Sequence, residues 1–245
     1  MIVDEYAPKT SRYCVLIPII NENGRIKAQL RRAQNIGADI IICDGGSTDG
    51  STESLESLGV NTLLTKTGPG KQGAQLRMGL SWGLARGYEG FITIDGNNKD
   101  SIEDVPDFIK KLDEGYDFVQ GSRFIPGGRA VNTPFMRYIA VRLIHAPVIS
   151  LIAGRRFTDT TNNFRAYSNK YITHPEVQPL RDIFDTYELL AYLSVKAAKL
   201  GLKTCEIPVT RAYPKGKTPT KITGLRGNFL LLKILFETAR GTYDV

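Results

Sequence analysis

The chain has 245 residues, of which 42% are hydrophobic and 23% charged, with a net charge of +7 and a pI of about 9.3. This length and composition fit one large globular domain or two small ones. The positive charge indicates an anionic partner: a nucleic acid, a membrane surface or a phosphorylated substrate. The three cysteines, Cys14, Cys43 and Cys205, lie far apart in the sequence, which argues against a disulfide framework or a cysteine metal site.

The N-terminal residues include Asp4, Glu5 and Pro8, where a secretory signal would have a basic start followed by an apolar run. No apolar run reaches the roughly 18 residues of a transmembrane helix. We therefore expect neither a secretory signal nor a membrane span, and a reducing, cytoplasmic setting.

In the first half of the chain, nearly continuous apolar runs alternate with helical patterns. Strands are predicted at 13–20, 38–44, 60–65, 90–95 and 116–122, and helices at 25–36, within 68–87 and at 104–114, with a short helix after the turn at 45–51. Short connections between apolar strands and helices are typical of a doubly wound α/β fold. The prediction is a mostly parallel sheet flanked by helices.

The regular alternation of strands and helices is less clear in the second half of the chain. The segment 134–154 is apolar but carries Arg137, Arg142 and His145, and Pro147 should bend it. We expect it to be too short and too interrupted to span a bilayer. It is either a basic amphipathic segment on a membrane surface or a helix pair packed on the core. A helix near 180–200, a strand at 203–210, a flexible basic stretch at 211–224 and an apolar helix at 228–239 complete the chain.

Polar loops follow three predicted strands where each strand ends: "NEN", "DGGSTDG" and "DGNNKD". In open α/β sheets, ligands bind beyond the carboxyl ends of the strands. Asp44 and Asp95 should therefore lie on the same rim. Taken singly, each loop could be an ordinary turn, because Asp, Asn and Gly are common turn residues. Three such loops on one rim favour a binding site.

The ordered motifs "IPIINE", "DGGSTDGS", "GKQGAQLRMGL", "ITIDGN", "GSRFIPGG", "DTTNNFRAY" and "AAKLGLKTCEIPV" resemble those of family-2 glycosyltransferases with the GT-A fold. The likeness is greatest to the dolichyl-phosphate mannose synthase and polyprenyl-phosphate glycosyltransferase branch, and it runs over about residues 13–222. We expect residues 1–222 to form the GT-A domain. Residues 223–245 should form a C-terminal helix that packs on the domain, a membrane surface or a dimer partner.

The resemblance implies roles for individual residues. The residues implied to bind the nucleotide-sugar are Pro18, Asn21, Glu22, Asp44, Gly46, Ser47, Lys71, Asp95 and Gly96. The implied catalytic residues are Asp95, Arg123, Glu188 and Arg211, and the implied acceptor-binding residues are Arg123, Arg165, Lys217 and Lys221.

The metal motif of the family is Asp-x-Asp, and this chain departs from it. Asp95 takes the first place, but Asn97 takes the third. Mg²⁺ or Mn²⁺ would bridge the donor diphosphate, and such ions prefer charged oxygen ligands. An amide oxygen should bind the ion more weakly, and Lys99 or Asp100 could compensate. Asn162 and Asn163 are a further departure, which should alter the acceptor pocket.

The chemistry of transfer leaves the acceptor open. Breaking a glycosyl–phosphate bond leaves growing negative charge on a nucleoside diphosphate, which a metal, Lys or Arg must stabilise. A lipid phosphate is already an anion and needs only cations to position it. A sugar hydroxyl needs a carboxylate base, for which Asp185 and Glu188 are candidates, although a structural role for Glu188 fits equally well.

The favoured function is inverting transfer of a sugar from a nucleotide-sugar to a polyprenyl phosphate, by a peripheral protein on the inner face of the membrane. One alternative is a glycosyltransferase with a glycan or soluble hydroxyl acceptor. Another is a catalytically weak nucleotide-sugar-binding protein, which Asn97 suggests. No nucleic-acid recognition motif is present, so nucleic acid is not an expected partner. The apolar C-terminal helix could form a homodimer contact.

Overall fold

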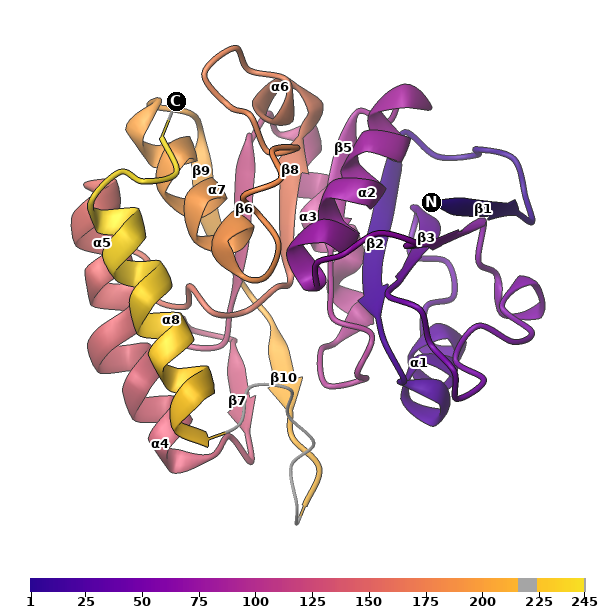
Figure 1. Cartoon of the computed structure of the whole chain (residues 1–245), viewed down its shortest axis with the longest axis horizontal. Coiled ribbons are helices and arrows are strands. Elements are labelled where there is room, and N and C mark those ends of the chain that lie inside the picture. The colour runs from indigo at the N-terminus through magenta and orange to yellow at the C-terminus, as the bar shows by residue number, and fades with distance from the viewer. Residues whose placement is uncertain (216–223, 245) are drawn as a thin grey trace.

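The computed structural model describes residues 1–215 and 224–244, and side chains for residues 1–215 and 229–244. Figure 1 shows a central sheet with helices on both faces. The order of its strands is β1 (Ile2–Glu5), β4 (Thr62–Thr65), β3 (Asp39–Asp44), β2 (Tyr13–Ile19), β5 (Gly90–Thr93), β8 (Arg165–Ser168), β6 (Phe118–Ser122) and β9 (Thr204–Pro208). A second, two-stranded parallel sheet pairs β7 (Arg129–Val131) with β10 (Thr210–Ala212).

The α-helices are α1 (Asn23–Arg32), α2 (Gln72–Ala85), α3 (Val105–Asp113), α4 (Phe135–Ile139), α5 (Ala146–Ala153), α6 (Asn169–Ile172), α7 (Glu188–Lys199) and α8 (Gly224–Ala239). The described residues also contain two short 3₁₀ turns, η1 (Glu56–Leu58) between β3 and β4 and η2 (Ile102–Asp104) before α3, and one π-helical segment, η3 (Ala140–His145), between α4 and α5.

The predicted mostly parallel sheet is confirmed, with two strands that the sequence pattern did not predict. β2 pairs in parallel with both β3 and β5, and β6 pairs in parallel with β9. β1 and β8 run antiparallel to their neighbours. β8 is only four residues long and contains an arginine, so its sequence carries little of the apolar signal of a buried strand.

The two faces of the sheet bury two separate cores, because successive side chains of a strand point to opposite faces. On β2, Cys14 and Leu16 pack in the core that contains α2 and α7. Val15 and Ile17 pack in the core that contains α1 and α3. Pairing between β2 and β5 ends at Leu16 and Thr93, so the missing N–H of Pro18 breaks no bond to β5.

The segments α4, η3 and α5 form one continuous helix, which we call the long helix (Phe135–Ala153). The bend expected at Pro147 takes the form of a widened turn, in which the Ala146 N–H donates to the Val141 carbonyl five residues earlier. A wide turn makes room for a proline ring, which would clash with an α-helical carbonyl four residues back.

The expectation that this segment is too short to span a bilayer was wrong on length. The long helix has 19 residues. Over its most apolar stretch of 18 residues the mean hydropathy is 1.5, and 17% of that stretch is buried. Among the described residues, it is the one helix with the length and composition to cross a membrane.

The C-terminal helix α8 packs on the rest of the domain. Ile234 and Leu235 are buried in the same core as α5 and α7. Figure 1 shows α8 running beside the long helix, on the side of the molecule away from β1. The two helices therefore form one outer layer.

Candidate active site

The rim is the edge of the central sheet at which β2, β3 and β5 end. Two of its loops, those that follow β2 and β3, are joined by hydrogen bonds. The Asn21 N–H donates to Ser47 Oγ over 2.9 Å, and the Thr48 N–H donates to Asn21 Oδ1 over 2.9 Å. The Glu22 N–H donates to Ser51 Oγ over 2.7 Å. The structure thus brings together the loop residues that the sequence predicted for this part of the rim.

Asp44 is buried in this part of the rim and holds its own turn. Its carboxylate accepts from the Gly46 N–H at 2.9 Å, and from the Ser47 N–H at 3.0 Å and Oγ at 2.5 Å. The turn shapes the rim, with Gly46 at a φ of +94° that favours glycine. Direct contact between Asp44 and a nucleotide stays a prediction.

Two close contacts fix the strand ends, and the sequence analysis assigned neither of them. The buried Gln75 side chain donates to the Ile19 carbonyl over 2.6 Å and to the Cys43 carbonyl over 2.7 Å, which joins the ends of β2 and β3. A Cβ on Gly96 would lie 2.4 Å from Ile19 Cγ2. Gly96 is therefore needed for packing against β2.

Asp95 is the centre of the site. Its carboxylate accepts hydrogen bonds from Arg211 at 3.0 Å, from Gln72 at 3.1 Å and from Asn163 at 3.1 Å, and Asn97 Nδ2 lies 3.4 Å away. These partners come from the start of α2, the loop before β8 and β10. Three distant segments of the chain thus converge on the aspartate at which the fourth predicted strand ends.

Arg211 links Asp95 to a second aspartate. Its guanidinium also pairs with Asp100, which is fully buried. Burial opposes the charge of Asp95, but Arg211 and the hydrogen bonds from Arg211 and Asn163 outweigh it, so the pKa of Asp95 lies below its usual value. At Asp100 burial outweighs Arg211, and the pKa is raised.

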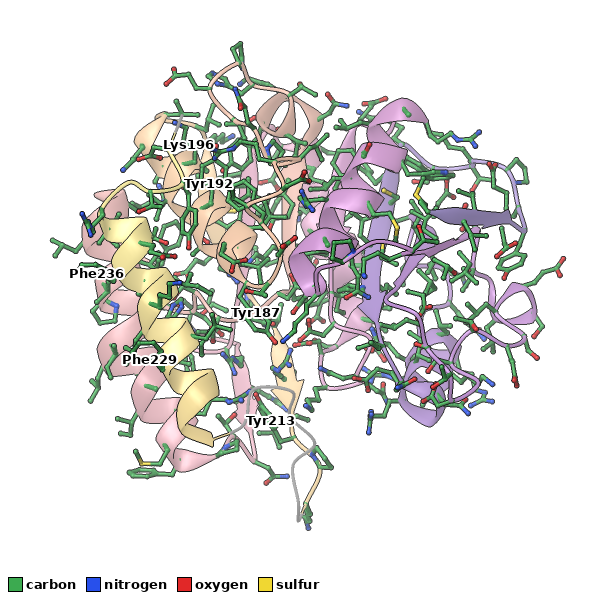
Figure 2. All side chains as sticks on the ribbon, viewed as in Figure 1. Tyr187, Tyr192, Lys196, Tyr213, Phe229 and Phe236 are labelled. Carbon is green, nitrogen blue, oxygen red and sulfur yellow. The ribbon has the colours of Figure 1, made fainter. Side chains whose placement is uncertain are left out.

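Three cationic side chains surround the ring of Tyr213, and we call them the cation cluster. Lys99 Nζ lies 5.1 Å from the ring centroid, and the guanidinium carbons of Arg211 and Arg137 lie 5.7 and 5.8 Å away. Arg137 also donates to Tyr213 Oη over 3.2 Å. Figure 2 shows Tyr213 beneath the sheet, beside β10. A cluster of like charges on an aromatic ring is suited to an anion.

The electrostatics of the cluster agree with that reading. Burial, and then Arg211, lower the pKa of Lys99. Burial would raise the pKa of Tyr213, but Arg211 and Arg137 outweigh it and lower that pKa. The sequence analysis missed Arg137 as a site residue because it lies in the apolar segment, and only the pairing of β7 with β10 brings that segment to the rim.

Arg123 is not a member of the cation cluster, and its side chain is paired with Asp159. It is buried and forms a two-pronged ion pair with Asp159, with Nε to Oδ2 at 2.6 Å and Nη2 to Oδ1 at 2.8 Å. Nη2 also donates to Thr161 Oγ1 over 3.1 Å. This geometry makes Arg123 a positioning residue for the 159–161 loop. A direct catalytic or acceptor contact stays a prediction.

Arg165, which was predicted to bind the acceptor, makes its contacts inside the protein, and a contact with the acceptor stays a prediction. Its side chain is fully buried, and it donates to the carbonyls of Asn162 at 2.8 Å, Leu190 at 2.6 Å and Thr160 at 2.7 Å. Arg165 therefore satisfies buried carbonyls at the start of α7 and in the loop before β8. Sequence patterns cannot reveal which carbonyls will need a donor.

Two other predicted groups lie at the start of a helix. Glu188 accepts from the Thr186 N–H at 2.6 Å and Oγ1 at 2.5 Å, so it holds the turn that opens α7. Lys71 is exposed before α2, and its N–H donates to the Asp185 carbonyl over 2.8 Å. A role for Glu188 as a base stays a prediction. Lys217 and Lys221 lie outside the described residues.

The rim is a poor fit for a divalent cation. In the described parts of the chain, no group of three or more His, Cys, Asp or Glu side chains could hold a metal. Asp95 and Asn97 lie side by side as predicted, but Asp95 already bonds to Arg211, and Asn97 Oδ1 accepts from the Lys99 N–H at 3.3 Å. Mg²⁺ in such sites is held by one or two carboxylates and by substrate phosphates, and here the carboxylate of that kind, Asp95, is already neutralised by Arg211 and faces Lys99.

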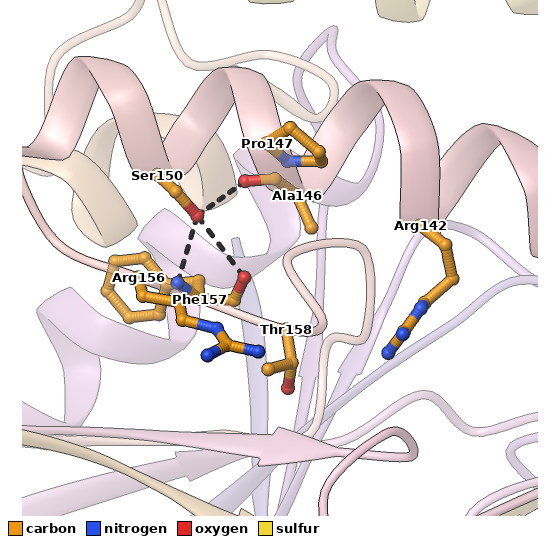
Figure 3. Close-up of a pocket in the computed structure, with 7 residues that line it drawn as sticks. All are labelled: Arg142, Ala146, Pro147, Ser150, Arg156, Phe157 and Thr158. Carbon is orange, nitrogen blue, oxygen red and sulfur yellow. Dashed lines mark hydrogen bonds between the residues drawn. The ribbon is translucent and has the colours of Figure 1, made fainter.

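A separate hollow of about 260 Å³ lies beneath the long helix (Figure 3). Arg142 and Arg156 line it together with Thr158. Ser150 Oγ accepts from the Phe157 N–H over 2.9 Å and so closes one side. None of the residues predicted for the rim lines this hollow.

The comparisons with known proteins agree with this geometry. A family model described as glycosyl transferase family 2 matches residues 14–183, more than half of the chain. The chain belongs to glycosyl transferase family 2. The predicted family and the predicted glycosyltransferase activity are thereby confirmed.

Two curated relatives of this glycosyltransferase have names that refer to polyprenyl-linked phosphates. The undecaprenyl-phosphate mannosyltransferase of Micrococcus luteus is 27% identical over 206 residues, covering 81% of this chain and 83% of the relative. The polyprenol monophosphomannose synthase of Mycolicibacterium smegmatis is 24% identical over 208 residues, covering 82% and 77%.

A solved structure supports the fold of the glycosyltransferase. Glucosyl-3-phosphoglycerate synthase from Mycobacterium tuberculosis, in complex with Mg²⁺ and uridine diphosphate, superposes with a TM-score of 0.62 at 18% identity, covering 95% of this chain and 80% of that one. The predicted GT-A fold is confirmed.

Proposed function

We propose that this glycosyltransferase moves a sugar from a nucleotide-sugar to a polyprenyl phosphate at a membrane surface. The observation that carries the proposal is the position of Arg137. It belongs to the cation cluster around Tyr213, and it lies on the long helix directly after the exposed Phe135 and Met136. An anion site at the base of an exposed apolar surface fits a phosphate that bears a hydrocarbon tail.

The apolar surface extends over both outer helices, and we call it the apolar face. Its exposed members are Phe135, Met136, Leu143, Ile144 and Leu151 on the long helix, and Phe229, Leu232 and Phe236 on α8. On the long helix two adjacent pairs and Leu151 recur every seven or eight residues, and on α8 the members recur every three or four residues, which places them on one side of each helix. Figure 2 shows Phe229 and Phe236 on the side of α8 away from the sheet.

Contacts on the opposite side hold the long helix against the domain. Val141, Ala146 and Ile149 are buried, and His145 Nδ1 lies 2.7 Å from Thr160 Oγ1. A helix with one side packed on the protein and the other exposed and apolar is suited to lie in the membrane interface. We propose that residues 1–222 carry out the transfer and that the apolar face, including the helix in residues 223–245, holds the protein to the inner face of the membrane.

The chemistry follows from the charges. A polyprenyl phosphate is an anion and needs no general base, so Arg137, at the end of the cation cluster nearest the long helix, would position it for attack on the anomeric carbon. An inverting displacement places this attack opposite the departing diphosphate. Fixed cations beside that diphosphate stabilise the charge that develops as the bond breaks. The loops at Asn21 and Ser47 would hold the nucleoside. Because the rim does not fit a divalent cation, this sequence of steps involves none.

The substitution Arg137→Gln tests the proposal. It removes one member of the cation cluster without touching Asp95, so it should raise the KM for polyprenyl phosphate in vesicles about 10- to 100-fold while leaving nucleoside diphosphate binding unchanged. Arg31→Gln, on the exposed end of α1, is the matched control and should change neither quantity. An unchanged KM in Arg137→Gln would contradict the proposed acceptor site.

The second candidate is transfer to a glycan or soluble hydroxyl, in which Asp185 or Glu188 acts as base. Glu188→Gln separates the two functions. A hydroxyl acceptor requires the carboxylate, so Glu188→Gln, or Asp185→Asn if Asp185 is the base, would lose far more turnover than any loss of folding measured by circular dichroism melting explains. A lipid phosphate requires no base, and turnover would persist. If the apolar face binds a second copy of the chain in place of a membrane, sedimentation should show a dimer and no vesicle binding.

A further inference from the structure

The loop after Asp95 holds Lys99 rigidly in the site. The Asn98 N–H donates to Gln29 Oε1 over 2.8 Å, and the Lys99 carbonyl accepts from the Ala212 N–H over 2.7 Å. Asp100 then bridges to Arg211 on β10. Lys99 as a whole residue is only 7% exposed, which is unusual for a lysine. Its ammonium is therefore a fixed charge of the rim.

Positively charged side chains already lie beside Asp95, where a bound metal ion would lie. Arg211 neutralises Asp95 at 3.0 Å and also pairs with the buried Asp100. A divalent ion at Asp95 would have to displace this guanidinium and would face Lys99 as well. A diphosphate in the same place would meet Lys99 and Arg211 with its own charge opposite to theirs. The rim is thus complementary to an anion without an added metal.

We infer that Lys99, supported by Arg211, takes the place of the divalent cation for the donor diphosphate, so that donor binding and transfer proceed without metal. The inference rests on the proposed function and identifies the group that neutralises the leaving diphosphate. An ammonium offers three hydrogen-bond donors and a compact charge. Asn97 is uncharged where the family has a second aspartate, so it adds no carboxylate beside Lys99.

Calorimetric titration of UDP, GDP, CDP and dTDP into the full chain, in EDTA and then in excess Mg²⁺ or Mn²⁺, tests the inference. For the nucleotide that binds, we expect affinities that differ by less than about threefold between the two conditions. Lys99→Gln should weaken binding in EDTA by about 10- to 100-fold, as expected for the loss of a charge-assisted hydrogen bond. Lys110→Gln, an exposed lysine on α3, is the matched control and should bind like the unaltered protein.

A double variant gives the sharper result. Asn97→Asp with Lys99→Gln removes the ammonium and adds the missing carboxylate, so it should bind the nucleotide in Mg²⁺ and lose it in EDTA. Circular dichroism melting of each variant checks that it folds. Binding by the unaltered protein only with metal would overturn the inference and leave the proposed function standing. No binding of any nucleoside diphosphate in either condition would overturn the proposed function itself.

Discussion

The charged rim and the apolar face differ in how their groups are satisfied. At the rim, Asp95, Asp100 and Arg211 are bonded to one another beneath the sheet. On the apolar face, Phe135 and Leu151 expose 74% and 84% of their surface to solvent. Proteins bury charges where they are paired, and large exposed apolar patches mark surfaces that something else covers. The two aspartates of the rim are paired within the chain, and the apolar face needs a partner.

The two regions meet at Arg137, which belongs to the long helix and contacts Tyr213 at the rim. A substrate with a polar head and an apolar tail would use both regions at once. Damage to the rim should therefore affect stability and donor binding together. Damage to the apolar face should affect only attachment to the membrane.

The largest expected effect comes from Arg211→Leu. The substitution leaves Asp100 buried without its cation, which should lower the free energy of unfolding by about 3–5 kcal/mol. Urea unfolding followed by circular dichroism measures the loss. Arg211→Lys keeps a charge but cannot pair with Asp95 and Asp100 in the same way. Its free energy of unfolding should lie between those of Arg211→Leu and the unaltered protein. A variant Arg211→Leu as stable as the unaltered protein would show that the pair does not hold the rim.

Gly96→Ala should have the next largest effect. A Cβ at this position would lie 2.4 Å from Ile19 Cγ2, so β2 or the Asp95 loop must shift. We expect a loss of about 1–3 kcal/mol in thermal unfolding, together with weaker nucleotide binding. Gly24→Ala, in α1 where a Cβ would meet nothing within 4 Å, is the control and should stabilise the protein by about 0.5–1 kcal/mol.

The apolar face gives the opposite outcome. Leu151→Asp, at the most exposed of these positions, should leave the free energy of unfolding within about 0.5 kcal/mol of the unaltered value. It should weaken sedimentation with lipid vesicles by about tenfold, because a buried leucine contributes about 1.5–3 kcal/mol. Unchanged vesicle binding would contradict the proposal that the apolar face binds the membrane. A loss of stability would mean that Leu151 is covered within the chain.

The smallest expected effect is a difference in acid sensitivity. Burial opposes the charge of Asp159, but Arg123 outweighs it and lowers the pKa of Asp159 below its ordinary value. A carboxyl with a lowered folded pKa contributes stability above the unfolded pKa and loses it as the pH falls through the folded one. The difference in melting temperature between the unaltered protein and Asp159→Asn should therefore shrink below about pH 4. Asp107→Asn, which removes a carboxylate at an exposed position, is the matched control.

Sequence reasoning reached the parts of this site that local patterns encode. The alternation of apolar strands and helices predicted the sheet, and the loops after 13–20, 38–44 and 90–95 predicted a rim with Asp44 and Asp95. It could not predict β8 or the burial of Arg165, because a four-residue strand and a carbonyl-binding arginine leave no periodic signal. It also missed Arg137. The contact of Arg137 with Tyr213 depends on the pairing of β7 with β10, whose paired residues lie 81 positions apart in the sequence.

The most direct test of the account is transfer itself. The purified chain would be incubated with vesicles containing polyprenyl phosphate and with labelled UDP-, GDP-, CDP- and dTDP-sugars, and label in the extracted lipid would be measured. The account predicts label in the lipid from one nucleotide class, and none when polyprenol without its phosphate replaces the acceptor. Label that reaches only water-soluble products, with or without the lipid phosphate, would contradict it.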